Sequence, residues 1–320
     1  MFIKRIFAVL FLISAGLSAG GQHVADSMRI SLGYPVYSQY LQNGLVINPA
    51  YAGTRGAMSA FMSYRMQWIG TKGSPLLQSL SAHSPMKNDK VSLGLLARFM
   101  QYGVTKTSSV YADYAYAIRF REGRLSFGLQ GGLDISNTDY TGLLLFDQND
   151  PVFEADNKPY ILPNVGAGVY YYTGRYFAGL AIPSFLSYRR STGGSTLLYH
   201  SFGEYSFIIS GGAVFDITAD IKLKPSILFD YSLRKTRKLN QFDLNINMIY
   251  ADTFWGGLSW RVPEQVLVTI FQVQLNQQIM AGISYDYPAG RMNSFSKGST
   301  EFTLRYDFGY KVSAANPRYF

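Results

Sequence analysis

Apolar and polar residues alternate with a period of two along most of the chain from residue 57 onward. In the stretch 124–137 the apolar positions are Leu125, Phe127, Leu129, Leu133 and Ile135. Small and polar residues fill the positions between them, as in a strand with one face toward lipid and one toward a polar interior. Soluble antiparallel sheets also alternate, but segments of about 10 to 14 residues repeated along a chain are typical of membrane barrels. The pattern predicts an all-β fold, a transmembrane antiparallel β-barrel.

The alternating segments predict about 14 strands, and their connections provide a second criterion. We place the strands near 57–66, 76–83, 90–101, 106–120, 124–137, 164–173, 175–182, 203–216, 220–233, 239–250, 253–261, 265–275, 278–288 and 299–310. Bacterial barrels have an even strand number, short periplasmic turns and longer external loops. If the first strand starts in the periplasm, the three longest gaps all lie outside: 138–163, 183–202 and 289–298. The gap lengths therefore favour 14 strands with both termini in the periplasm.

The first 21 residues have the three parts of a secretory signal peptide. Lys4 and Arg5 precede an apolar stretch from Ile6 to Ile13, and small residues follow up to Gly21. The apolar stretch is too short to span a bilayer, and the small residues suit signal peptidase. A buried N-terminal helix is the alternative. We expect a signal peptide over 1–21, a pre-barrel segment over 22–56, the barrel over 57–310 and a C-terminal tail over 311–320.

Composition agrees with a barrel and disfavours a helical membrane protein. Hydrophobic residues make up 48% of the 320 residues, yet the mean hydropathy is +0.01. The mature chain has no apolar run of about 18 residues or more, the length that a membrane-spanning helix needs. Cysteine is absent, so there is no disulfide framework. Aromatic residues near strand ends suit the interfacial girdle of a barrel, or ordinary packing: Tyr64, Trp68, Trp255, Trp260, Tyr285 and Tyr287.

Positive charge does not indicate a nucleic-acid partner, although the formal net charge is +9. Basic residues are scattered, and their one dense cluster is Arg234–Lys238. This cluster indicates a solvated loop, which we expect to contact anionic lipopolysaccharide or an acidic partner. Charges within the strands should face the lumen and pair there. The expected carboxylates are Asp113, Asp134, Asp230 and Asp243, and the expected cations are Arg98, Arg119, Lys222 and Lys224.

No constellation of residues indicates catalysis, a metal or a cofactor. The three histidines, His23, His83 and His200, stand far apart in the sequence. A metal site or an activated nucleophile needs clustered ligands or an oriented base. The acidic set in the loop 138–163 fits no calcium-loop spacing and reads as solvated: Asp147, Asp150, Glu154 and Asp156. We therefore expect no enzyme activity, no cofactor and no metal site.

Residues 34–86 carry motifs that alternation does not explain. They contain Tyr-Pro-Val-Tyr-Ser-Gln-Tyr (34–40), Leu-Val-Ile-Asn-Pro-Ala-Tyr-Ala-Gly (45–53), Tyr-Arg-Met-Gln-Trp (64–68) and Gln-Ser-Leu-Ser-Ala-His-Ser-Pro (78–85). In this order the segments resemble the start of the PorP/SprF family of type IX secretion system membrane proteins. Later segments at 254–261, 284–287 and 301–304 are similar to its later signatures. The chain departs from the family pattern at Tyr34, where an acidic residue is frequent, and at Thr300, where histidine is frequent.

The resemblance implies an integral outer-membrane protein of Bacteroidota that works with the type IX machinery. It implies an adaptor or anchor for the secretion or surface attachment of specific cargo, such as adhesins with a C-terminal sorting domain, including gliding-motility adhesins. The implied partners are the periplasmic ring and peptidoglycan-binding components, the cargo adhesin and outer-membrane lipid. A diffusion pore or a transporter of hydrophobic substrates is the alternative function.

The pre-barrel segment is a poor membrane strand, because it contains two prolines and no long alternation over 34–56. Asn48-Pro49 and Ala52-Gly53 indicate a tight path before the first strand. We expect a short plug or clasp that either contacts a partner or seals the lumen, or simply closes the base of the barrel. The signature residues proposed for this contact are Tyr37, Gln39, Tyr40, Asn48, Pro49, Tyr51, Gly53, Arg65, Gln67 and Trp68.

Overall fold

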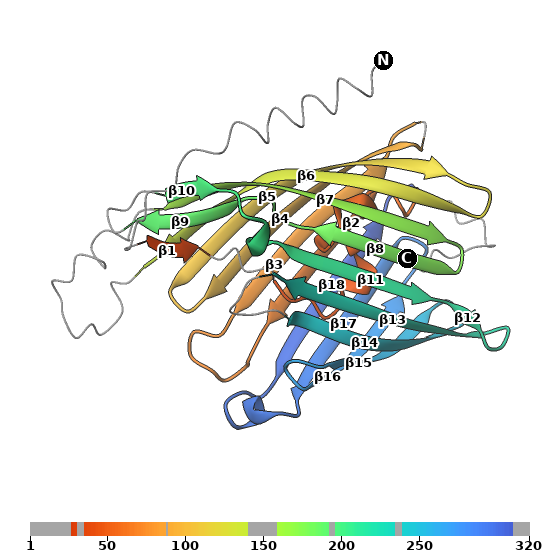
Figure 1. Ribbon diagram of the computed structural model, residues 1–320. Helices are drawn as coiled ribbons and strands as arrows, with labels where there is room; N and C mark the ends of the chain where they lie inside the picture. Colours follow the sequence, from red (N-terminus) through yellow and green to blue (C-terminus); the bar gives the residue numbers. More distant parts are fainter. Residues whose placement is uncertain are drawn as a thin grey trace, which may run out of the picture.

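A computed structural model describes residues 27–30, 35–87, 89–139, 159–191, 196–233 and 239–309. It forms a closed antiparallel β-barrel, drawn in Figure 1. The wall strands are β2 (Ser59–Met66), β3 (Leu76–Pro85), β4 (Val91–Tyr102), β5 (Thr105–Arg119), β6 (Gly123–Thr138), β7 (Tyr160–Thr173), β8 (Tyr176–Ile182), β11 (Ser206–Ala213), β12 (Phe215–Asp216), β13 (Ile221–Ser232), β14 (Leu239–Tyr250), β15 (Phe254–Arg261), β16 (Val266–Gln274), β17 (Ile279–Pro288) and β18 (Ser299–Asp307).

The wall has 14 strands, as predicted, because β11 and β12 form one strand interrupted at Val214. Each strand pairs with its neighbour in the chain order, and the barrel closes where β18 pairs with β2. The strand bounds agree with those expected to within a few residues, since alternation is a local signal that the pleated strand reproduces.

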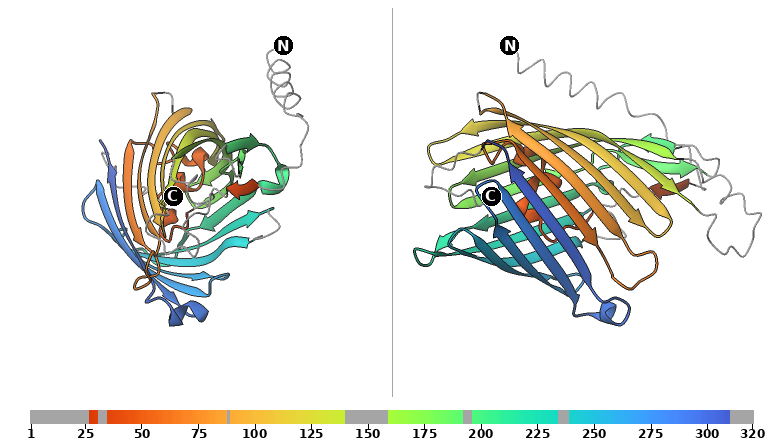
Figure 2. Two further views of the ribbon diagram at one scale, coloured as in Figure 1. Left: turned by 90° about the vertical axis from the view of Figure 1, so that its left-hand side faces the viewer. Right: turned by 180° about the vertical axis from the view of Figure 1, so that it is seen from behind.

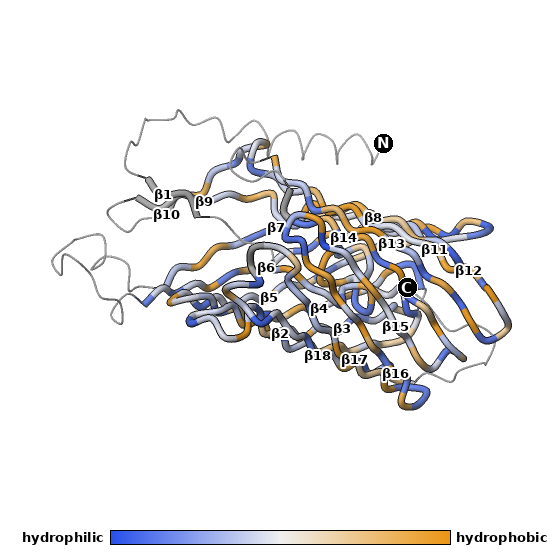
Figure 3. Tube along the Cα trace, turned by 90° about the horizontal axis from the view of Figure 1, so that it is seen from below, coloured by the Kyte–Doolittle hydropathy of each residue, from blue (hydrophilic) through white to orange (hydrophobic). Residues whose placement is uncertain are grey.

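Hydrophobic and hydrophilic residues alternate along the wall strands (Figure 3), and the two kinds lie on opposite faces, as expected. In β6, Phe127 and Leu129 are 45% and 61% exposed on the outside, whereas Ser126 and Gln130, on either side of this pair, are 2% and 8% exposed. A polar residue turned to the outer face would lie in lipid at a cost, so the period of two fixes the register of each strand against its neighbours. The outer surface is consequently apolar and the lumen polar.

Long connections gather at one end of the barrel, the long-loop end, and short turns at the other, the short-turn end. The turn between β14 and β15 is residues 251–253, in which Ala251 and Asp252 have φ angles of 49° and 51°. Two residues in the left-handed region match the twist of a hairpin, which is why such a short turn closes it. Strand β2 starts at the short-turn end, as predicted for the first strand.

The chain before β2 does not stay at that end. Strand β1 (Ser27–Ile30) lies at the long-loop end beside β9 (Ser187–Ser191) and β10 (Thr196–Tyr199), with which it forms a separate three-stranded sheet (Figure 1). Residues 35–58 run through the lumen to the start of β2. The sequence placed the N-terminus at the same end of the barrel as the start of the first strand. That prediction was wrong, because β1 lies at the opposite end. The small sheet was not predicted, since its strands of four and five residues show no alternation.

Aromatic residues line the outer face as expected, with one exception. Trp68, Trp260, Tyr285 and Tyr287 are between 38% and 49% exposed near the long-loop end. Trp255 instead points into the lumen and packs against the core, which corrects its assignment to the girdle. Among the described residues, no helix has the length and hydrophobicity needed to cross a membrane.

Several expectations concern residues outside the described ranges. These are the signal peptide, the acidic set of the loop 138–163, the basic cluster 234–238 and His23.

Candidate functional site in the occupied lumen

The segment from residue 35 to 58 forms three single turns of 3₁₀-helix: η1 (Tyr40–Gln42), η2 (Gly44–Val46) and η3 (Pro49–Tyr51). Asn43 and Asn48 begin the second and third turns, each accepting a hydrogen bond from the backbone N–H two residues later. Pro49 starts η3 where a free N–H is not needed. Asn-Pro therefore sets a tight path here, as the sequence indicated.

This segment fills the barrel and is called the plug below, residues 35–56. Within 37–55 every residue is buried except Leu41 and Gly44, which are half-buried. Its side chains reach strands on opposite sides: Asn43 Nδ2 lies 2.6 Å from Ser81 Oγ of β3, and Tyr40 accepts a hydrogen bond of 2.6 Å from Asn245 of β14. The end-on view in Figure 2 shows the segment inside the ring of strands. A water-filled passage around the plug would leave its residues exposed, so the lumen is occupied at this level.

Glycines in the wall let the plug approach closely. A Cβ added to Gly128 of β6 would lie 2.1 Å from the backbone nitrogen of Ala50. A Cβ on Gly168 of β7 would lie 2.1 Å from Asn48 Oδ1. Asn48 also donates to the carbonyl oxygen of Val169 at 3.0 Å. Glycine in these strands therefore marks a close approach of the plug rather than a turn, with the Ala50 backbone at Gly128 and the Asn48 side chain at Gly168.

A buried network of charges joins the plug to the wall toward the long-loop end. We call it the Ser38 cluster, and its members are Ser38, Arg65, Asp243, Arg261, Asp286 and Glu301. All six are 3% exposed or less. The charged members come from β2, β14, β15, β17 and β18, so the network joins five strands of the wall.

Ser38 lies at the centre of this cluster. Its hydroxyl donates to Asp286 Oδ1 at 2.8 Å and accepts from Arg65 Nη1 at 2.8 Å. Its backbone N–H donates to Glu301 Oε2 at 2.8 Å. Arg65 Nη2 lies 2.6 Å from Asp286 Oδ2, and Arg261 Nη1 lies 3.2 Å from the same oxygen. Every charge is thus compensated by at least one opposite charge, which buried ions need.

The cluster unites signature segments that are far apart in the sequence. Arg65 belongs to 64–68, Arg261 to 254–261, Asp286 to 284–287 and Glu301 to 301–304. Only Arg65 was proposed as a contact residue from the sequence. The other three were recognisable as charges on the inward positions of apolar strands, but their convergence depends on contacts separated by more than 200 residues.

A second charged group holds the other end of the plug. We call it the Arg55 cluster, and its members are Arg55, His83, Arg305 and Asp307. Arg55 Nε and Arg305 Nε each lie 3.3 Å from the carboxylate of Asp307. His83 Nδ1 accepts a hydrogen bond of 3.1 Å from the backbone N–H of Gly53. Strand β18 therefore contributes to both clusters, Glu301 near one end of the plug and Asp307 near the other.

Eight of the ten residues proposed from the sequence meet in the lumen, and two do not. The eight buried residues are Tyr37, Gln39, Tyr40, Asn48, Pro49, Tyr51, Gly53 and Arg65. Gln67 and Trp68 instead follow β2 at the long-loop end, where Trp68 is 41% exposed.

Tyrosines of the plug face the barrel, not the surface. The Tyr51 ring packs edge-on against His83 at 5.5 Å and against Tyr170 at 5.6 Å. The Tyr40 hydroxyl accepts a hydrogen bond from Asn245 of the wall.

The expected carboxylates face the lumen, and two of them have partners that were not among the expected cations. Asp243 pairs with Arg261. Asp134 instead accepts hydrogen bonds from Ser109 and Tyr111. The expected cations Arg119 and Lys222 pair near turns, with Asp89 and Asp252. The inward orientation of a charged side chain follows from its place in the alternation along its strand. Its ion-pair partner depends on the register between strands, which the alternation does not give.

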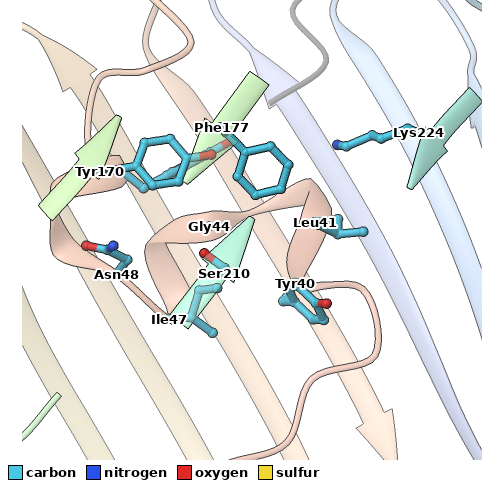
Figure 4. A pocket seen from close by; sticks show the side chains of 10 residues that line it. Tyr40, Leu41, Gly44, Ile47, Asn48, Tyr170, Phe177, Ser210 and Lys224 are labelled. Atoms are coloured by element: carbon cyan, nitrogen blue, oxygen red, sulfur yellow. The ribbon is translucent and has the colours of Figure 1, made fainter. Parts of the chain in front are cut away.

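A small pocket lies between the plug and the strands β7, β8, β11 and β13 (Figure 4). It contains about 330 Å³ of empty space, including space open to solvent. Lys224 is 1% exposed and points its Nζ toward the rings of Phe177 and Trp255, 5.6 Å from each centroid. Among the described residues, no group of histidine, aspartate and glutamate side chains is arranged to hold a metal.

Comparisons with known proteins identify one matching family. Residues 30–306 match the family described as type IX secretion system membrane protein PorP/SprF. No curated protein matches the chain significantly. Among solved structures, the Ralstonia pickettii toluene transporter TbuX is 8% identical and covers 87% of this chain and 95% of its own, with a TM-score of 0.49. The CymD monoaromatic hydrocarbon channel is 12% identical over 89% and 95%, with a TM-score of 0.49. Acinetobacter baumannii Omp33 is 5% identical over 79% and 98%, with a TM-score of 0.45.

Proposed function

Because the chain belongs to the PorP/SprF family of type IX secretion system membrane proteins, we propose that it is a non-catalytic adaptor or anchor in the outer membrane. In this role it serves the secretion or surface attachment of specific cargo, such as adhesins that carry a C-terminal sorting domain. The long-loop end faces the outside and the short-turn end faces the periplasm, as in other bacterial barrels.

The observation that carries this proposal is the occupied lumen. A diffusion pore needs a water-filled path, and here the plug is buried against strands on opposite sides. The Ser38 and Arg55 clusters hold it at both ends. The polar groups inside the wall bind the protein's own plug. This supports the interpretation of the barrel as a fixed scaffold, in which the outer rim and the two ends are available to partners. The periplasmic ring and peptidoglycan-binding components are the partners proposed for the short-turn end.

Deleting the gene tests the proposal most directly. Secreted and surface-exposed proteins of the deletion strain are compared by mass spectrometry with those of the parent and of the complemented strain. We expect specific cargo proteins to be lost from the medium or from the surface and to return on complementation. If neither the secreted nor the surface-exposed proteins change in the deletion strain, the adaptor role is overturned.

Conductance separates the adaptor from the alternative pore. The purified protein in planar bilayers should show no large steady conductance, because the plug occupies the lumen. Large steady conductance together with unchanged secretion in the deletion strain would favour the pore.

A further inference from the structure

One part of the wall lacks a strand. β7 has 14 residues, but only its second half, from Ala167, is paired with β8, which has seven. On the other side of β8, pairing with β11 starts at Ile208. Residues 160–166 of β7 therefore have a partner strand on one side alone, within the part of the chain that the structure describes. Because β8 lies between them, β7 and β11 are two strand spacings apart, about 10 Å. The gap toward the long-loop end is thus one strand wide.

The chain after β8 covers this gap without continuing the strand. Residues 183–188, called the strap, turn to the inner side of the wall, where Pro183 O accepts hydrogen bonds from Gln130 at 3.0 Å and Asn164 at 3.3 Å. A Cβ on Gly166 would lie 2.7 Å from Pro183 O, so glycine is what lets the strap cross β7. Both amide side chains face the lumen. The strap therefore leaves the plane of the wall.

Among the described residues, few backbone hydrogen bonds hold the strap to β7. Phe185 N donates to Val165 O at 2.9 Å, and the other contacts with β7 come from side chains: Ser184 Oγ to Asn164 Oδ1 at 2.8 Å, and the Tyr188 hydroxyl to Pro163 O. By comparison, β5 and β6 are in register over fifteen residue pairs. Pro163 offers no N–H, as is usual for proline at an unpaired strand edge. The seam at β7 is the place where the wall is least secured by strand pairing.

The strap is also linked to the N-terminal strand. Its last two residues, Ser187 and Tyr188, are the first two of β9, which pairs with β1, and Ile30 lies opposite Tyr188. The strap is thereby joined to the strand that precedes the plug in the chain.

We propose that the strap is a lateral gate, and that an extended segment of a client polypeptide adds as a strand to residues 160–166 of β7 when the strap moves out. This rests on the proposed function, because the client is the cargo of the adaptor. An unpaired strand edge binds extended chains through backbone groups of any sequence, which suits a client recognised by conformation. The inner side of the gap is polar, with Gln130 and Asn164, so it suits a polypeptide backbone better than an apolar small molecule.

Engineered disulfides test the gate in cells, and the chain has no native cysteine to interfere. The double variant Asn164→Cys with Ser184→Cys fixes the strap to β7 where the two side chains already touch. Its matched control is Ser63→Cys with Ser79→Cys, which joins β2 to β3 through a hydroxyl pair 2.7 Å apart. We expect cargo secretion to be lost when the strap is oxidised and restored by reductant, with the control unaffected. Normal secretion with a fully oxidised strap, in a host where gene deletion blocks secretion, would overturn the gate and leave the adaptor role standing.

A second measurement needs no cargo. Leu162 of β7 and Ser63 of β2 are each 1% exposed. In the purified protein, Leu162→Cys should react with a maleimide at least about tenfold faster than Ser63→Cys, because local opening exposes groups in the least stable part of a fold. Equal rates at the two positions would show that the seam at β7 opens no more than the rest of the wall, and the gate would be rejected.

Discussion

The Ser38 cluster and the Arg55 cluster hold the two ends of the same plug in different ways. In the Ser38 cluster the wall supplies every charge, three carboxylates and two guanidinium groups, and the plug adds a hydroxyl and an N–H. In the Arg55 cluster the plug itself supplies a cation to a carboxylate of β18. The Ser38 cluster therefore mainly joins wall strands to one another, and the plug attaches to it. The Arg55 cluster is an ion pair between the plug and the wall. Variants at the two ends should separate barrel stability from plug attachment.

The largest effect is expected from Arg65→Met. It leaves Asp286 and Glu301 buried with less compensation, and breaking a buried ion pair by removing one partner costs about 3–5 kcal/mol. The free energy of unfolding in detergent and urea, followed by tryptophan fluorescence, measures the loss. Arg65→Lys keeps the charge but not the planar fork, so its loss should be smaller. A loss for Arg65→Met no greater than that for an Arg55 variant would remove the distinction between the clusters.

Arg55→Met should cost less and act on the plug. Arg305 remains beside Asp307, so the carboxylate keeps a partner, and the loss is that of hydrogen bonds to a charged group, about 1.5–3 kcal/mol. Limited proteolysis should cut within residues 49–56 while the barrel resists, and Arg55→Lys serves as the control. Uniform resistance of the plug in both variants would contradict an anchoring role for Arg55.

Between the two clusters the plug is held by close packing against the wall rather than by ion pairs. The variant Gly128→Ala tests this packing. The new methyl group would overlap the backbone of Ala50, and overpacking of this kind costs about 1–3 kcal/mol. Gly131→Ala in the same strand is the matched control, because a Cβ there meets no atom within 4 Å. Equal unfolding free energies for the two variants would mean that η3 adjusts without cost.

The smallest effect is expected from Arg119→Ala. Its pair with Asp89 at 2.8 Å is about half exposed on both sides, and exposed ion pairs contribute about 0–1 kcal/mol. The midpoint of thermal unfolding should be nearly unchanged, and any small difference from the parent protein should shrink at high salt. A loss comparable to that of Arg55→Met would show that exposure does not distinguish this pair from the buried ones.

Alternation in the sequence predicted most of the wall because it is a local property of each strand. It also predicted that Asp243 faces the lumen, since this residue occupies an inward position. Trp255 was assigned to the girdle because it lies near a strand end. Phe254 and Trp260 occupy outward positions, so the alternation along this strand required Trp255 to point inward. Alternation therefore predicts the direction of a side chain better than its nearness to a strand end does.

The plug and its contacts could be predicted only in part. Two prolines and the lack of alternation indicated a segment that is not a membrane strand, but not its route. Ser38 meets Asp286 across 248 residues of sequence, and such a contact depends on how the barrel closes. The short strand β8 was placed correctly, whereas the gap beside it becomes visible only when its register with β7 is known.

The path of the plug has a consequence for the order in which the molecule is made. A chain that runs through a ring before forming the ring's first strand must already lie across the sheet when the ring is sealed at β2 and β18. Residues near β1 therefore have to reach the far side before the last hydrogen bonds form, or they must be threaded afterwards through a lumen with little room. Because the lumen leaves little room for threading, we expect the plug to be placed first and the seam between β2 and β18 to close afterwards.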